Sequence, residues 1–244
     1  MTLQWVALGV VVFFGLLRLP AAIRGENRVI FTVLLLMSLV MALSIPFFYL
    51  PLDSLLGGVN VANLVIRYSL FAIFLILGLK LAAAFDAQRA RRAIGGPAGR
   101  CVLAGSAVLV AVLFWLSDLP ESSTGLAAYW DQDAVHAYGD VAGLYPVYVG
   151  GCLIPALVAY TADSRRRNDI RISAGLMSLG FSAVVIHSVL GLTVLGLNVG
   201  AWDRVLPYGA VILVTLGLAL LWNSQRIAKR HPQPGLLARA YGSR

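Results

Sequence analysis

Long apolar stretches alternate with short polar connections along the whole chain. The stretches cover about residues 4–22, 30–50, 61–84, 102–119, 141–162, 172–196 and 205–222. Each is long enough to cross about 30 Å of hydrocarbon as a helix that rises about 1.5 Å per residue. The pattern therefore predicts an all-α, polytopic membrane protein, with a seven-transmembrane-helix bundle in residues 1–222 and a basic tail in residues 223–244.

The charged residues fall mainly in the connections and sort by sign between the two sides of the bundle. One side, together with the tail, carries 17 of the 19 lysines and arginines. The other side carries 7 of the 11 acidic residues and only Arg67 and Arg204 as cations. The positive-inside rule then places the amino terminus outside and the carboxyl terminus in the cytoplasm. We expect a multi-pass protein of a bacterial plasma membrane, with anionic lipid at its cytoplasmic face.

Composition narrows the class further. The chain is 59% hydrophobic and 12% charged, which disfavours a soluble helical domain. The net charge of +8 is explained by the basic connections, so we expect no nucleic-acid partner. The first stretch lacks a basic n-region and is longer than a usual signal-peptide core, so we expect it to remain as the first transmembrane helix. The alternative is a signal cleaved near Ala21 or Ala22, which would leave six spans.

Ionisable residues inside apolar stretches are candidates for function, because charge in hydrocarbon costs about 3 kcal/mol or more. Arg67 lies roughly 9 Å below the outer boundary of its stretch, and His187 lies in the outer half of another. The candidate ion-pair partners at the outer rim are Asp118, Asp140 and Asp203. A plain ion pair for Arg67, and a single hydrogen bond to a carbonyl for His187, are the alternatives to a functional role.

Aromatic residues extend these groups into a predicted ligand pocket that opens outward. Its expected members are Arg67, His187, Tyr145, Tyr148 and Trp115. The stretch that carries the two tyrosines also contains Pro146 and Pro155, which remove amide donors and predict a kinked helix. Such a helix either bends during function or is simply bent.

Known signatures of catalysis and cofactor binding are missing from the sequence. There is no HExxH, GxSxG or P-loop motif, and no cluster of cysteine and histidine. His187 is the only histidine in an apolar stretch, and the last stretch has no lysine for a Schiff base. We therefore expect a protein that is not an enzyme and holds no cofactor or metal, with Cys101 and Cys152 as packing residues.

Two polar segments outside the predicted spans are candidates for contacts. Residues 120–140 form the longest outer loop, which predicts either a lid over the bundle or a solvated connection. On the inner side, Arg165, Arg166 and Arg167 predict a contact with anionic lipid or with a cytoplasmic or membrane protein partner. The end of the tail predicts either an amphipathic stretch on the inner leaflet or a disordered segment.

The segment IPFFYLPLDSLLGGVNVANLVIRYSLFAIFLILGLK, residues 45–80, resembles a stretch of uncharacterised actinobacterial seven-transmembrane-helix proteins that are labelled as transporters. The matching elements are the proline that ends the second span, Asp53, the turn at 55–58, the region 60–63 and a helix beginning at Leu64. A looser match runs from Tyr129 to the arginines at 165–171. Members of that family usually continue into a longer cytoplasmic region, which this sequence does not contain.

Three functions remain open from the sequence. The first is a small-solute transporter whose outward pocket is formed around Arg67 and His187. The second is a ligand-sensing or partner-scaffolding membrane protein that docks its partner on the inner arginines. The third is an accessory subunit of a larger membrane complex.

Overall fold

A computed structural model describes residues 2–26, 28–192 and 202–230, without the side chains of residues 203, 204, 225 and 227–230. This part of the chain is helical and contains no strand. Its elements are α1 (Thr2–Ile23), α2 (Arg28–Leu43), α3 (Pro46–Leu55), α4 (Val61–Ala84), α5 (Gln88–Gly95), α6 (Pro97–Leu116), η1 (Thr124–Tyr129), α7 (Asp133–Ala162), α8 (Asn168–Leu190) and α9 (Trp202–Arg230).

Six of these helices are long and apolar enough to cross a membrane: α1, α4, α6, α7, α8 and the Val205–Ser224 part of α9. The pair α2 and α3 passes the same test only when the two are taken together, and they meet at an angle of 94°. The prediction of an all-helical, multi-pass membrane protein is therefore confirmed, with six or seven spans. Which end faces the cytoplasm stays a prediction.

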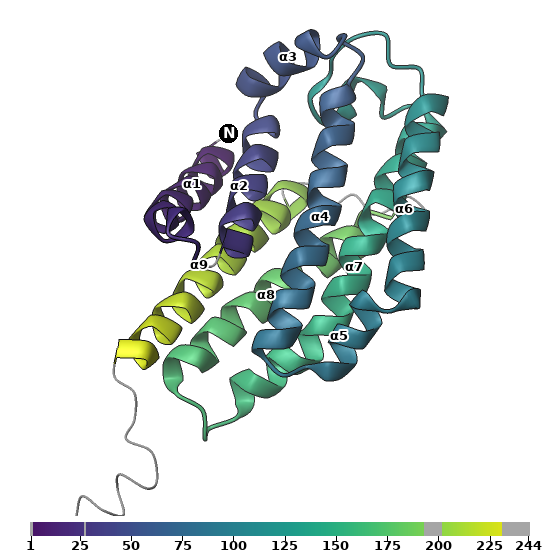
Figure 1. The fold of residues 1–244 in the computed structure, drawn as a ribbon. Helices are drawn as coiled ribbons and strands as arrows, with labels where there is room; N and C mark the ends of the chain where they lie inside the picture. Colours follow the sequence, from purple (N-terminus) through teal and green to yellow (C-terminus); the bar gives the residue numbers. More distant parts are fainter. Residues whose placement is uncertain (1, 27, 193–201, 231–244) are drawn as a thin grey trace, which may run out of the picture.

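The stretch 30–50 was expected to form one span, but the structure divides it at Ser44. The Ser44 hydroxyl donates to the Val40 carbonyl at 2.8 Å, which closes the last turn of α2. Ile45 precedes a proline and has extended φ and ψ angles of −105° and 125°, as the proline ring requires. Pro46 then begins α3, where its missing amide costs nothing. The result is a short helix that lies across one end of the bundle (Figure 1).

Other boundaries differ from the sequence prediction by one turn or more. α7 begins at Asp133 rather than near 141, so Asp140 lies inside a helix instead of opening it. α9 continues to Arg230, past the expected end of the last span at 222, while residues 231–244 of the predicted tail lie outside the described part. The connection 85–100 contains the helix α5, which buries Ala90 and Ile94 and leaves its arginines outward.

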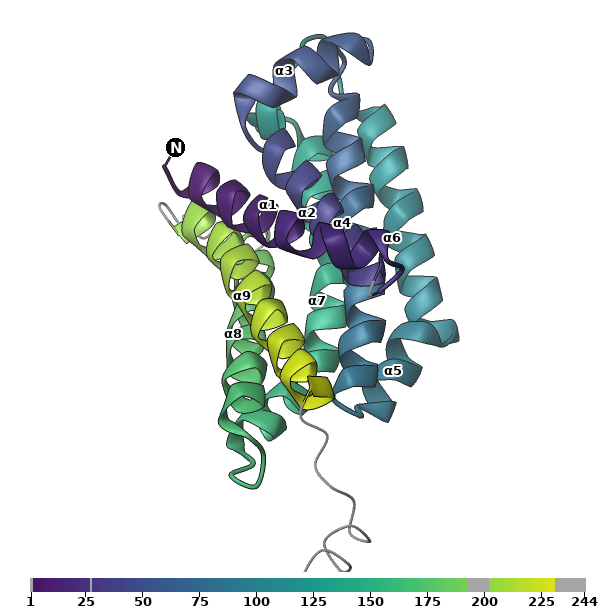
Figure 2. The ribbon, with the colours of Figure 1, turned by 60° about the vertical axis from the view of Figure 1, so that its left-hand side comes forward.

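The helices do not all run parallel. α4, α6, α7 and α8 form the body of the bundle, and α1 crosses it obliquely beside α9 (Figures 1 and 2). The tightest packing is between α8 and α9. A Cβ atom built on Gly180 would lie 2.6 Å from the Val214 Cγ2 atom, and one on Gly217 would lie 2.6 Å from the Met177 Cγ atom. Small residues at these positions let the two backbones approach closely.

The two ends of the bundle differ in the charged residues that they carry. We call one the acidic end, and it is formed by α3 and residues 117–132 (Figure 1). We call the other the basic end, and it is formed by α5, the turn between α7 and α8, and the last turns of α9 (Figure 1).

Candidate functional site

Asp53 is the centre of a hydrogen-bonded network at the acidic end. Its side chain is fully buried, with 0% exposure. One carboxylate oxygen accepts the Asn60 amide and the other accepts the Ala62 amide, both at 2.8 Å. Asn60 is the N-cap residue of α4 and Ala62 lies in its first turn, at the positive dipole end of the helix, which favours a negative charge. Asp53 thus caps α4 from the preceding helix.

The turn that brings Asp53 back to α4 depends on left-handed backbone angles. Gly57, Gly58 and Asn60 have φ values of 107°, 72° and 65°. Glycine and asparagine are the residues that adopt this region most readily. The sequence GGVN at 57–60 therefore allows the chain to reverse within a few residues and lay the start of α4 against Asp53.

The same network also fixes the position of the segment 117–132 by hydrogen bonds. The Ser122 hydroxyl donates to the Asp53 carboxylate at 2.5 Å, and the Ser123 amide donates to the Asn60 side-chain oxygen at 2.6 Å. The Asn60 side-chain amide donates to the Glu121 carbonyl at 2.7 Å, and the Tyr49 hydroxyl donates to the Asn60 oxygen at 3.1 Å. The part 120–132 of the expected loop is therefore held against α3 and α4 by hydrogen bonds.

A row of polar and aromatic side chains continues from this network into the bundle between α4 and α7. We call it the seam, and its members are Asn63, Arg67, Tyr138 and Tyr145. The Tyr138 hydroxyl donates to the Asn63 side-chain oxygen at 2.8 Å, and both residues are buried. One turn further along α4, the Arg67 guanidinium lies over the Tyr138 ring, with its Cζ atom 5.5 Å from the ring centroid. The Arg67 Nε atom is buried and has no hydrogen-bond partner among the described residues. A buried donor without a partner is costly, which marks Arg67 as a candidate binding group.

Tyr145 continues the seam two turns along α7. It is fully buried, and its ring packs edge-on against Phe71 with 5.9 Å between centroids. Its hydroxyl, like the Arg67 Nε atom, has no partner within the described part of the chain. Phe71 is four residues after Arg67, so the α4 residue that the Tyr145 ring contacts lies on the same face of α4 as Arg67.

The other two aromatic members of the predicted pocket lie elsewhere. The Tyr148 hydroxyl donates to the Ala93 carbonyl of α5 at 2.9 Å, which directs it toward the basic end. Trp115 is 81% exposed on the outer face of α6, where its ring contacts Phe114. Of the predicted aromatic residues, the structure thus brings only Tyr145 into the seam that holds Arg67.

The remaining predicted groups occupy the half-buried and exposed parts of the bundle. His187 in the last turns of α8 and Asp140 in α7 are half-buried, and both are engaged in interactions. Asp118 is exposed, and its backbone amide and carbonyl are held by the Gln132 side chain at 3.0 and 2.8 Å. The side chain of Asp203 lies outside the described residues.

The three arginines that were predicted to face the cytoplasm, Arg165, Arg166 and Arg167, lie on the exposed turn between α7 and α8. Arg166 pairs with Asp163 at 3.3 Å and lies over the Tyr160 ring at 4.7 Å, whereas Arg167 pairs with Asp169 at 2.8 Å. Arg165 is exposed as well. Nearby residues of the same chain therefore engage two of the three arginines.

The residues of the acidic-end network were not selected as site residues from the sequence. The donors to Asp53 come from positions seven, nine and 69 residues away, and only the fold reveals that they converge. Within residues 2–26, 28–192 and 202–230, no three side chains of His, Cys, Asp or Glu gather in a way that could hold a metal ion.

Comparisons with known proteins identify no relative of this chain. The chain matches no known protein family, and no curated protein or solved structure matches it either. The long apolar helices define the chain as an integral, multi-pass helical membrane protein.

Proposed function

We propose that this protein is a small-solute transporter of the plasma membrane, and that it binds an anionic solute at Arg67 in the seam between α4 and α7. Arg67 carries the proposal because this half-buried residue brings a permanent cation into an apolar bundle, and its buried Nε donor has no partner among the described residues. A solute carboxylate or phosphate would supply the missing acceptor, and the planar guanidinium suits both groups.

The surroundings of Arg67 support a polar ligand. The Tyr145 hydroxyl is a second buried group on the seam that lacks a partner in the described structure. The Tyr138 hydroxyl donates to Asn63, and the Tyr138 ring lies against the Arg67 guanidinium, so this pair positions Arg67 in the seam. A ligand that bridges Arg67 and Tyr145 would satisfy both orphaned groups.

The proposed route starts at the acidic end, which the positive-inside rule places outside the cell. Access to the seam from this end passes the segment 117–132, which is fastened to Asp53 and Asn60. This segment then acts as the lid of the outward pocket. Prolines at 146 and 155 give α7 two places at which its backbone ladder is interrupted, so α7 is the proposed moving helix.

The experiment compares stability and ligand response in one variant, Arg67→Met. If Arg67 serves a ligand, removing its cation leaves the unfolding midpoint of the purified protein unchanged or raises it, because binding sites are held at a cost in stability. The same change abolishes the response to small anions, probed with acetate, succinate, benzoate and inorganic phosphate, and abolishes their uptake into proteoliposomes. Trp115→Ala is the control, and it should keep both the response to small anions and their uptake.

Two results together would overturn the transporter proposal. If Arg67→Met strongly lowers the midpoint and none of the four anions stabilises the natural chain, Arg67 is a structural residue and the transporter proposal fails. A partner scaffold is then the better account, and it predicts that a co-purifying partner is released when Arg165, Arg166 and Arg167 are changed to alanine.

A further inference from the structure

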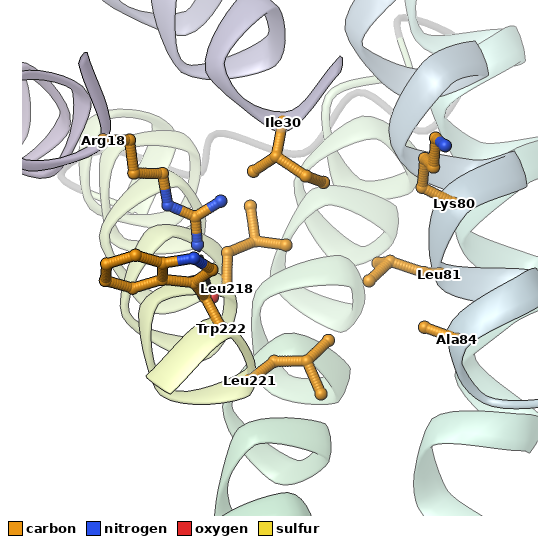
Figure 3. A pocket seen from close by; sticks show the side chains of 8 residues that line it. All are labelled: Arg18, Ile30, Lys80, Leu81, Ala84, Leu218, Leu221 and Trp222. Carbon is orange, nitrogen blue, oxygen red and sulfur yellow. Dashed lines mark hydrogen bonds between the residues drawn. The ribbon is translucent and has the colours of Figure 1, made fainter. Parts of the chain in front are cut away.

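A cavity of about 110 Å³ lies between four helices in the half of the bundle nearer the basic end. Figure 3 shows its walls: Arg18 of α1, Ile30 of α2, Lys80, Leu81 and Ala84 of α4, and Leu218, Leu221 and Trp222 of α9. Two of these eight residues are cations and none is acidic. The cavity therefore presents positive charge against an apolar wall.

Arg18 is the buried cation of this cavity. It is only 5% exposed, and its Nη2 atom donates to the Leu218 carbonyl at 2.8 Å. Its guanidinium lies over the Trp222 ring, with the Cζ atom 5.2 Å from the ring centroid (Figure 3). Among the described side chains, the ion pairs are those of Arg166 and Arg167, so Arg18 has no carboxylate partner there. A guanidinium has five donors, and a carbonyl neutralises no charge.

Two other cations, Lys80 in the lining and Arg226 beside Trp222, add to the charge of Arg18. Lys80 is exposed on the opposite wall, and it also lines a second, more open groove with Arg91 and Arg92 of α5. Arg226 lies over the same Trp222 ring as Arg18, at 5.4 Å from the ring centroid. With no acidic residue in the lining of the cavity, these positive charges raise the local concentration of anions.

The depth of the cavity matches the region where lipid headgroups meet acyl chains. Lys80 lies four residues before the end of α4, which is about 6 Å along the helix. Trp222 lies two residues before the end of the apolar part of α9, and tryptophan favours the membrane interface. The wall of the cavity is apolar beside the cations, where it is formed by Leu81, Leu218 and Leu221.

We propose that this cavity binds the phosphate of an anionic phospholipid, with Arg18 and Lys80 as the phosphate ligands and the leucines as contacts for the start of the acyl chains. A free phosphate would satisfy the same cations, but it would leave the apolar wall uncovered. Basic cavities between membrane helices are suited to lipid headgroups for this reason.

The test titrates dioleoyl phosphatidylglycerol into the full chain, purified in a neutral detergent, and follows the unfolding midpoint. Dioleoyl phosphatidylcholine supplies the same acyl chains without net charge, and inorganic phosphate supplies the anion alone. We expect phosphatidylglycerol to stabilise the protein more than either. Lys80→Gln and Arg18→Gln should each weaken the apparent affinity for phosphatidylglycerol about ten-fold, the value of one charge-assisted contact.

Arg89→Gln is the matched control, because Arg89 is an exposed cation of α5 that lines neither cavity. It should keep the response to phosphatidylglycerol, and so should Arg67→Met, which separates this site from the proposed solute site. The proposal is overturned if phosphatidylcholine or phosphate alone reproduces the full shift, or if Lys80→Gln behaves like Arg89→Gln. Because Lys80 is exposed, its variant tests the site even if Arg18→Gln does not fold.

Discussion

Asp53 at the acidic end and Arg18 in the half nearer the basic end are both buried charges, with exposures of 0% and 5%. Asp53 accepts three hydrogen bonds, two from amides of the N-cap and first turn of α4 and one from Ser122. Arg18 donates to one carbonyl and lies against a ring beside a cavity. The chain itself satisfies the buried acid, whereas the buried base is left for a group from outside. Burial alone therefore does not distinguish a structural charge from a binding charge.

The largest effect is expected from Asp53→Asn. The new side-chain amide cannot accept all three donors, so buried donors lose their partners and the free energy of unfolding falls by about 3 kcal/mol. The segment 117–132 should also become accessible to protease, because Asp53 holds Ser122. Ser54→Ala, at the exposed neighbour of Asp53, should change neither measurement. An unaffected Asp53→Asn protein would show that the network contributes little.

Next comes Gly217→Ala, which tests whether the cavity near Arg18 reflects loose packing throughout that part of the bundle. A Cβ at 217 would lie 2.6 Å from the Met177 Cγ atom and 3.1 Å from the Ser173 carbonyl oxygen. Forcing α8 and α9 apart should lower the free energy of unfolding by about 2 kcal/mol. Gly209→Ala in the same helix meets no atom within 4 Å and should be tolerated. If both variants unfold at the same temperature, the close packing of α8 and α9 does not stabilise the protein.

A smaller loss is expected from Ser122→Ala, which removes one of the three donors to Asp53 and leaves the two α4 amides in place. The free energy of unfolding should fall by about 1 kcal/mol, the value of a single hydrogen bond. Chemical denaturation of Ser122→Ala and of Asp53→Asn measures how much of the network's stabilisation comes from the cap of α4 and how much from the loop that carries Ser122. If Ser122→Ala lowers the free energy of unfolding as much as Asp53→Asn does, the whole stabilisation by the network comes from its contact with the loop.

The smallest effect is expected from Arg167→Ala on the turn between α7 and α8. Its pair with Asp169 is at 2.8 Å, but the two side chains are 52% and 31% exposed. Solvent screens such pairs, so the free energy of unfolding should change by less than about 0.5 kcal/mol. A loss above 1 kcal/mol, roughly twice that bound, would mean that exposed charges in this protein matter as much as buried ones.

The helices themselves were predictable from the sequence, because hydropathy is a local property. The apolar stretches appear as helices throughout the part of the chain that the structure describes. The break at Ser44 was harder to predict, since the stretch 30–50 is apolar on both sides of it. Pro46 was recognised as a helix boundary, but the 94° bend depends on where α3 packs.

The candidate site was predictable only in part. Arg67 was found from the sequence because a cation inside an apolar stretch is visible locally. The convergence of Asp53, Asn60 and Ser122 depends on the fold, which joins residues up to 69 positions apart. Arg18 lies near the end of its apolar stretch, which locally indicates a residue of a basic connection, whereas its contact with Leu218 joins residues 200 positions apart. The short helix α5 was missed for a different reason, since eight residues with three arginines resemble a loop.

The most direct test of the contrast compares Asp53→Asn and Arg18→Gln in nanodiscs of pure phosphatidylcholine and in nanodiscs that also contain phosphatidylglycerol. The account predicts that Asp53→Asn lowers the unfolding midpoint by the same amount in both membranes, because its partners belong to the chain. It predicts that the gap between the natural chain and Arg18→Gln widens when phosphatidylglycerol is present. An Arg18→Gln loss that is equal in both membranes would contradict the claim that Arg18 is completed from outside.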